Sequence, residues 1–105
     1  MMQLHSYTLA SADALRRYTT IFWSRHIQSL HKYGITVQGV WVDVGAPGHR
    51  VIALVGYPPD SDPALLAETY RASADFASDH ADFDVSLIIS TQTATLEGIP
   101  SSPLK

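Results

Sequence analysis

The sequence contains no cysteine, and this absence excludes several kinds of site at once. Without thiols the chain can form no disulfide framework, no thiolate zinc site and no cysteine nucleophile. Charge is also scarce, because charged residues make up only 16% of the 105 residues and the net charge is −3. Nucleic-acid binders use a basic patch to neutralise phosphates, and no run of Lys or Arg occurs here, so we expect no nucleic-acid partner.

Long apolar runs are missing as well. A membrane-spanning helix needs about 18 or more consecutive apolar residues, and the sequence has no such stretch. The first residues do not show the basic and then apolar pattern of a signal peptide. We therefore expect a cytoplasmic protein with no membrane partner, built as a single domain over residues 1–97 with a flexible tail over residues 98–105.

Apolar periodicity and turn residues predict an alternation of strands and helices. Strands are expected where residues alternate with period two or form short β-branched runs, and helices where apolar residues recur at helical spacing. The predicted order is strand, helix, strand, strand, helix, strand, over residues 2–9, 12–33, 35–44, 50–57, 63–80 and 84–96.

Capping residues set the predicted helix ends. Ser11 can accept a hydrogen bond from a free N–H group at the start of the first helix, and Gly34 allows a left-handed backbone after its end. Asp62 is expected to cap the second helical region, which Ser73 or Asp75 can divide into two shorter helices.

This order of elements is the split β-α-β pattern. It predicts an α+β fold of the ferredoxin-like βαββαβ type, with a four-stranded antiparallel sheet and both helices on one face. The sequence has no further element to cover the other face of the sheet. A second copy of the chain is the simplest cover, so we expect a homodimer.

Two stretches resemble proteins of the NIPSNAP family. QLHSYTL is similar to the family's first strand, although His5 replaces its usual arginine. HKYGITVQGVWVDVG is similar to the family's Lys-Tyr-Gly, Gly-x-Trp and Gly sequence. The matching residues are Leu4, Tyr7, Thr8, Leu9, Lys32, Tyr33, Gly34, Gly39, Trp41 and Gly45.

The resemblance extends over about residues 3–96. The stretch 51–57 is similar to an apolar strand of the family that ends in tyrosine, and Arg71 with Phe76 is similar to its second-helix region. The resemblance implies a dimeric α+β barrel. The wider superfamily includes cofactor-free monooxygenases, haem-degrading enzymes and polyketide cyclases or isomerases, which implies an enzyme acting on a small molecule.

His26 is the leading candidate for chemistry. A helical wheel places it on the apolar stripe marked by Leu15, Phe22 and Tyr33, so its ring is expected to face the sheet. A histidine there can act as an acid or base, with a titration between about pH 5 and 8. The alternative is a structural histidine in the core. The expected hydrogen-bond partners are His5, Tyr7 and Tyr57.

The other candidates each have two interpretations. His5 and Tyr7 share one face of the first strand, which meets either the helices or a partner. Trp41 and Tyr57 are either core or interface aromatics or ligand contacts. Arg71 binds a carboxylate or enolate, or forms an ion pair with an acidic neighbour: Glu68, Asp75 or Asp79.

Cofactors are not expected. His26 and His31 are five residues apart and no His-x-x-x-His pair occurs, so no metal site is predicted. His26 or His80 could ligate a haem, but no basic patch is evident for its propionates, and His80 is equally suited to cap a helix end. We therefore expect neither a metal nor a tightly bound organic cofactor.

The sequence leaves two functions open. The first is an enzyme without an organic cofactor that acts on a planar or polyketide-like molecule by proton transfer, isomerisation, cyclisation or oxygenation. Its expected catalytic residues are His26, Tyr7 and Tyr57, and its expected ligand contacts are His5, Phe22, Trp41 and Arg71. The second is a non-catalytic binding or assembly module. A pocket beside His26 favours the enzyme, and a cavity filled by Phe22, Tyr33 and Trp41 favours the module.

Overall fold

The strands form one antiparallel sheet in the order β2-β3-β1-β4, in a computed structural model that describes residues 1–45 and 47–104. Ala46 and Lys105, which fall in the predicted hairpin loop and tail, lie outside the described residues. The elements are β1 (Met2–Leu9), α1 (Ala12–Arg17), the π-helix η1 (Tyr18–Phe22), α2 (Trp23–Lys32), β2 (Thr36–Val42), β3 (His49–Gly56), α3 (Pro63–Arg71), α4 (Ala74–Asp79), the 3-10 turn η2 (Val85–Leu87) and β4 (Ile88–Leu96).

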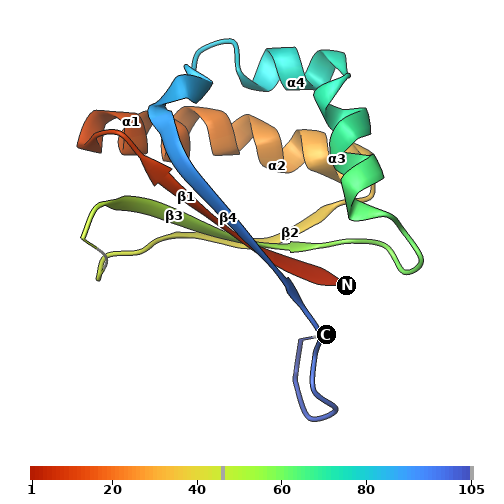
Figure 1. The fold of residues 1–105 in the computed structure, drawn as a ribbon. Coiled ribbons are helices and arrows are strands. Elements are labelled where there is room, and N and C mark those ends of the chain that lie inside the picture. The colour runs from red at the N-terminus through yellow and green to blue at the C-terminus, as the bar shows by residue number, and fades with distance from the viewer. Residues whose placement is uncertain (46, 105) are drawn as a thin grey trace.

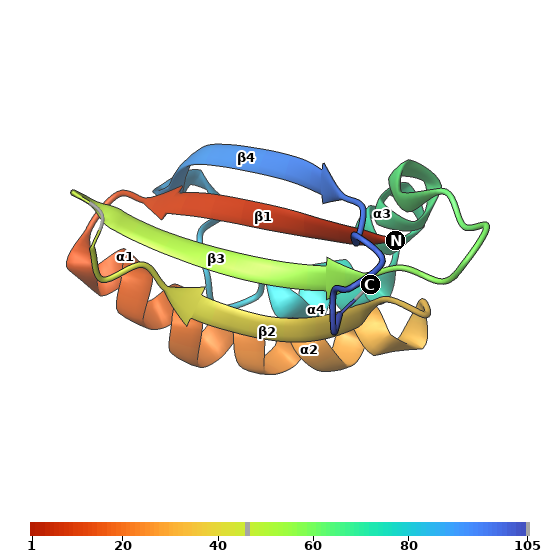
Figure 2. The same ribbon diagram turned by 90° about the horizontal axis from the view of Figure 1, so that it is seen from below.

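The helices α1 to α4 lie on one face of this sheet (Figure 1). Figure 2 shows the strands side by side with the helices behind them. This arrangement confirms the predicted ferredoxin-like α+β fold. None of the described helices is long and apolar enough to cross a membrane.

The predicted caps are confirmed. The Ser11 side chain accepts a hydrogen bond from the Ala14 N–H at 3.1 Å, and Gly34 has a φ of 76°. Asp62 caps α3. Ser73 is the residue that divides the second helical region, because its side chain caps α4 at the Phe76 N–H.

The first helix contains a π-helical turn that the wheel did not predict. Two threonine hydroxyls bond to main-chain carbonyls there, Thr19 Oγ1 to Leu15 at 3.0 Å and Thr20 Oγ1 to Arg16 at 2.7 Å. Such bonds compete with the helical ladder, and a π turn holds one additional residue. The inward face after the turn is therefore shifted, and Trp23 is buried in the core.

The first strand turns its His5 and Tyr7 face toward the helices. These residues pair with Ala53 and Val51 of β3, which are completely buried. This resolves the alternative that the sequence left open.

The open face carries a different set of side chains. Trp41 pairs with Ile52 on that face, and its indole lies against Gly39, where a Cβ atom would be only 2.4 Å from Trp41 Cη2. The Gly-x-Trp spacing thus lets an aromatic ring cover a glycine two residues away on edge strand β2.

The last strand begins later than predicted. Asp84 was expected to open it, but its carboxylate accepts a hydrogen bond from the Ser86 N–H at 3.0 Å and caps the turn η2. The strand β4 therefore starts at Ile88.

Candidate functional site

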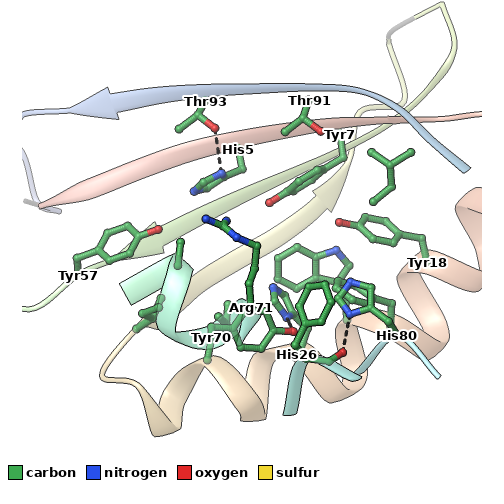
Figure 3. Close-up of a pocket in the computed structure, with 17 residues that line it drawn as sticks. His5, Tyr7, Tyr18, His26, Tyr57, Tyr70, Arg71, His80, Thr91 and Thr93 are labelled. Atoms are coloured by element: carbon green, nitrogen blue, oxygen red, sulfur yellow. Dashed lines mark hydrogen bonds between the residues drawn. The ribbon is translucent and has the colours of Figure 1, made fainter. Parts of the chain in front are cut away.

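A cavity of about 370 Å³ lies between the helices and the sheet (Figure 3). Strands β1 and β4, the π-helical turn and helices α2, α3 and α4 all contribute to its wall. Its lining residues are His5, Tyr7, Tyr18, Phe22, Trp23, His26, Leu30, Ile35, Tyr57, Ala67, Tyr70, Arg71, Phe76, His80, Ile88, Thr91 and Thr93.

His26 lies on this wall in a largely aromatic setting. Its side chain is 12% exposed, and the ring centroids of Phe22 and Trp23 lie 4.6 Å and 4.9 Å from its own. Phe22 and Trp23 are adjacent in sequence, and adjacent residues of a regular α-helix point in different directions. The π turn shifts the phase of the helix, so both residues line the cavity. The ring neither points to bulk solvent nor packs in a solid core.

A buried carboxylate lies behind His26. Asp79 is 2% exposed and accepts hydrogen bonds from Tyr70 Oη at 2.5 Å and from Ser29 Oγ at 2.8 Å. The His26 Nδ1 atom lies 2.9 Å from Tyr70 Oη and 3.4 Å from Asp79 Oδ2. His26, Tyr70 and Asp79 thus form a hydrogen-bonded network beside the cavity.

The network determines the tautomer of His26. The single hydroxyl hydrogen of Tyr70 is donated to Asp79, so the Tyr70 oxygen can only accept from His26. Nδ1 must therefore carry a hydrogen, and Nε2 of the neutral ring holds a lone pair. Nε2 has no hydrogen-bond partner among the described residues and is not one of their fully buried unpaired atoms, and the His26 residue lines the cavity.

Burial lowers the pKa of His26 from 6.5 to about 4, although hydrogen bonding to Asp79 and its charge act in the opposite direction. The ring is therefore neutral at neutral pH, and its titration lies near pH 4 rather than in the predicted range of pH 5 to 8. Burial and Asp79 raise the pKa of Tyr70, so its hydroxyl keeps its hydrogen.

The expected partners of His26 were wrong. His5, Tyr7 and Tyr57 do not bond to it; Tyr70 and Asp79 do. Asp79 was expected only as one of three acidic neighbours that could pair with Arg71. A usable signal was that Tyr70 and Asp79 are nine residues apart on two helices separated at Ser73, where a change in helix direction can bring both inward.

The structure brings most of the predicted contacts to the cavity. His5, Tyr7, Phe22, Tyr57 and Arg71 all line it. Burial raises the pKa values of Tyr7 and Tyr57 and lowers that of His5, so at neutral pH the phenols keep their hydrogens and the imidazole is neutral. His5 Nδ1 lies 3.2 Å from Thr93 Oγ1.

Arg71 and Trp41 are two of the candidates for which the sequence allowed two interpretations. Within the described residues no carboxylate lies within 4.0 Å of Arg71, so the alternative of a surface ion pair is wrong. Trp41 is 54% exposed on the open face of the sheet and does not line the cavity. The aromatic wall is instead made by Phe22, Trp23 and Phe76.

His80 has both a structural contact and a place in the cavity wall. Its Nδ1 atom donates to the Phe76 carbonyl at 2.7 Å, which confirms the predicted capping of a helix end. Its ring also lies 4.7 Å from that of Phe22, between centroids. In the part of the chain that the structure describes, no three His, Asp or Glu side chains are grouped to hold a metal ion.

No family model and no curated protein matches this chain, but solved structures do. A NIPSNAP domain protein from Burkholderia xenovorans is 14% identical, with 98% of this chain and 99% of that one covered and a TM-score of 0.78. A NIPSNAP family protein of unknown function from Agrobacterium tumefaciens is 15% identical, with 99% and 92% covered and a TM-score of 0.82. The chain has the NIPSNAP fold.

A more distant likeness lies outside NIPSNAP proteins. A putative antibiotic biosynthesis monooxygenase from Nitrosomonas europaea is 15% identical, with 94% of this chain and 99% of that one covered and a TM-score of 0.58. At these identities the likenesses establish the fold, and the chemistry must be argued from the cavity.

Proposed function

We propose that the protein is a small-molecule enzyme that transfers a proton through His26 and needs no tightly bound organic cofactor. The observation that carries this proposal is the lone pair of His26 Nε2, which has no partner among the described residues on a ring that lines the cavity, while Nδ1 is held by Tyr70 and Asp79. A base in a fixed tautomer, oriented by a buried carboxylate, is an arrangement suited to general base catalysis.

The proposed step begins with a substrate whose C–H or O–H bond is acidified by a neighbouring carbonyl. His26 Nε2 takes that proton, and the bonding electron pair stays on the substrate as an enolate. The new positive charge on His26 is stabilised by Asp79, 3.4 Å from Nδ1. Return of the proton to a different atom of the substrate completes an isomerisation or assists a cyclisation.

Donors in the cavity can stabilise the enolate. The hydroxyls of Tyr7 and Tyr57 and the guanidinium of Arg71 face the same space (Figure 3). Preorganised donors aimed at a developing negative charge stabilise the transition state that leads to it. We propose isomerisation or cyclisation because proton transfer through His26 is the step that the geometry of the network supports.

Exchange of carbon-bound hydrogen provides the test. We would incubate the protein with phenylpyruvate and, separately, with the uncharged diketone benzoylacetone in D₂O, and follow loss of the acidic C–H signal by NMR. We expect faster exchange of at least one compound with the native protein and loss of that acceleration in His26→Gln. The matched control is His31→Gln, since His31 is exposed on the same helix. Rates equal to those in buffer for both compounds would contradict the proposal.

A binding function without catalysis is the second candidate. It is favoured by the lowered pKa of His26. An imidazole with such a pKa stays neutral near pH 7, which suits it to accept a hydrogen bond from a ligand more than to carry a proton during a reaction. In that case His26→Gln would weaken ligand binding, and the native protein would not accelerate exchange.

The open face of the sheet supports a homodimer. Trp41 and Leu96 are 54% and 41% exposed, and Leu4, Ile52 and Leu54 lie on the same face with partial exposure. We propose that a second copy covers these side chains over more than about 1,000 Å² in total. Trp41 is then an interface residue rather than a ligand contact.

A further inference from the structure

The lining of the cavity carries a positive charge, although the protein as a whole is acidic. The net charge of the chain is −3, yet among the described residues that line the cavity Arg71 is the one Lys or Arg and none is Asp or Glu. Arg16, Arg25, Lys32 and Arg50 each pair with an aspartate, whereas Arg17 and Arg71 have no ion-pair partner among the described residues. Arg71 is exposed, and its guanidinium is a positive charge at the cavity with no carboxylate within 4.0 Å.

Hydrogen-bond donors lie on both sides of this charge. Figure 3 shows Arg71 extending into the space between Tyr57 and the His5 and Tyr7 side chains of β1. The hydroxyls of Tyr7 and Tyr57 make no hydrogen bond within the part of the chain that the structure describes, and neither atom is fully buried. Both are thus free to donate to a ligand.

The wall around His26 has a different character. Phe22, Trp23 and Phe76 supply flat apolar surface around His26, whose Nε2 atom can only accept. A molecule that matches both walls carries an anionic group at one end and a planar apolar body at the other. The cavity, at about 370 Å³, lies near the lower end of ligand pockets, which suits a molecule of one or two rings.

We propose that the ligand is a planar aromatic or conjugated carboxylate, bound with its carboxylate between Arg71, Tyr7 and Tyr57 and its apolar body toward His26. A guanidinium can bind a carboxylate through two parallel hydrogen bonds, which fixes direction as well as charge. This inference names the substrate class of the proposed enzyme. It rests on the proposed function because both place the ligand in the same cavity.

The test uses two unreactive probes of nearly equal shape. Cinnamate carries a carboxylate and cinnamamide a neutral amide, and each would be titrated into the full-length protein by NMR at about 0.1 M salt. We expect cinnamate to bind about tenfold more tightly. Arg71→Gln should reduce that ratio to about one, and Arg71→Lys should retain only part of it, because Lys keeps the charge without the planar fork.

Arg17→Gln is the matched control, since Arg17 is exposed on α1 and lies outside the cavity lining. Its cinnamate preference should equal that of the native protein. The inference is overturned if cinnamamide binds as tightly as cinnamate, if Arg17→Gln loses the preference equally, or if neither probe binds at about 10 mM.

The outcomes separate this inference from the proposed function. An Arg71-dependent cinnamate preference without accelerated hydrogen exchange would leave the substrate class standing and remove the catalytic role of His26. Accelerated exchange of benzoylacetone without any carboxylate preference would leave the catalytic role of His26 standing and remove the proposed substrate class.

Discussion

Acid should destabilise the fold through His26. In the folded chain the pKa of His26 is lowered from 6.5 to about 4, so between these two values the unfolded chain binds a proton that the folded chain does not. Stability is therefore intact above about pH 6.5 and is lost as the pH falls toward 4. Since each pH unit across this window corresponds to about 1.4 kcal/mol, the loss amounts to about 3 kcal/mol.

Urea unfolding at several values between about pH 7 and pH 4.5 measures this loss. His26→Gln has no titrating group at position 26, so its free energy of unfolding should fall less steeply than that of the native protein. His5 is present in both chains, so its contribution cancels in the comparison. We expect the native protein to lose about 2–3 kcal/mol more than the variant.

His31→Gln is the control for this measurement, because His31 is exposed at the end of the same helix. Its unfolding free energy should follow the native pH dependence. Parallel curves for the native protein and His26→Gln would refute the reasoning, since they would mean that burial does not hold His26 neutral.

Two further predictions concern partners and cofactors. Sedimentation equilibrium at micromolar concentration should show a homodimer that Trp41→Ser weakens, because Trp41 is a large exposed apolar side chain on the open face; a monomeric native protein would sink this idea. Titration with haemin should give no sharp Soret shift, because among the described residues Arg71 is the one Lys or Arg that lines the cavity, and a haem has two propionates. A saturable Soret shift that His26→Ala abolishes would show that the protein binds haem through His26.

Much of the fold was determined by local sequence signals. Ser11, Gly34, Asp62 and Ser73 fix helix ends through contacts within a few residues, so their effect can be read without knowing the tertiary structure. Period-two alternation in residues 2–9 likewise shows that His5 and Tyr7 share a face. The order of elements followed from these signals, and with it the ferredoxin-like fold.

The tertiary structure decided which surfaces meet. Alternation cannot distinguish the two faces of a strand, so only packing on α2 assigned Tyr7 to the cavity and Trp41 to the open face. The π turn shifted the helical phase by a residue, which no fixed 100° wheel can follow, and made Trp23 part of the wall.

The hydrogen-bond partners of His26 were the part of the site that the sequence predicted least well. Tyr70 and Asp79 lie 44 and 53 residues away from it, on helices whose placement over α2 depends on the whole core. The sequence showed that His26 faces inward and needs a hydrogen-bond partner. Which carboxylate meets it, and hence which nitrogen keeps its lone pair, depends on contacts between helices that local patterns do not encode.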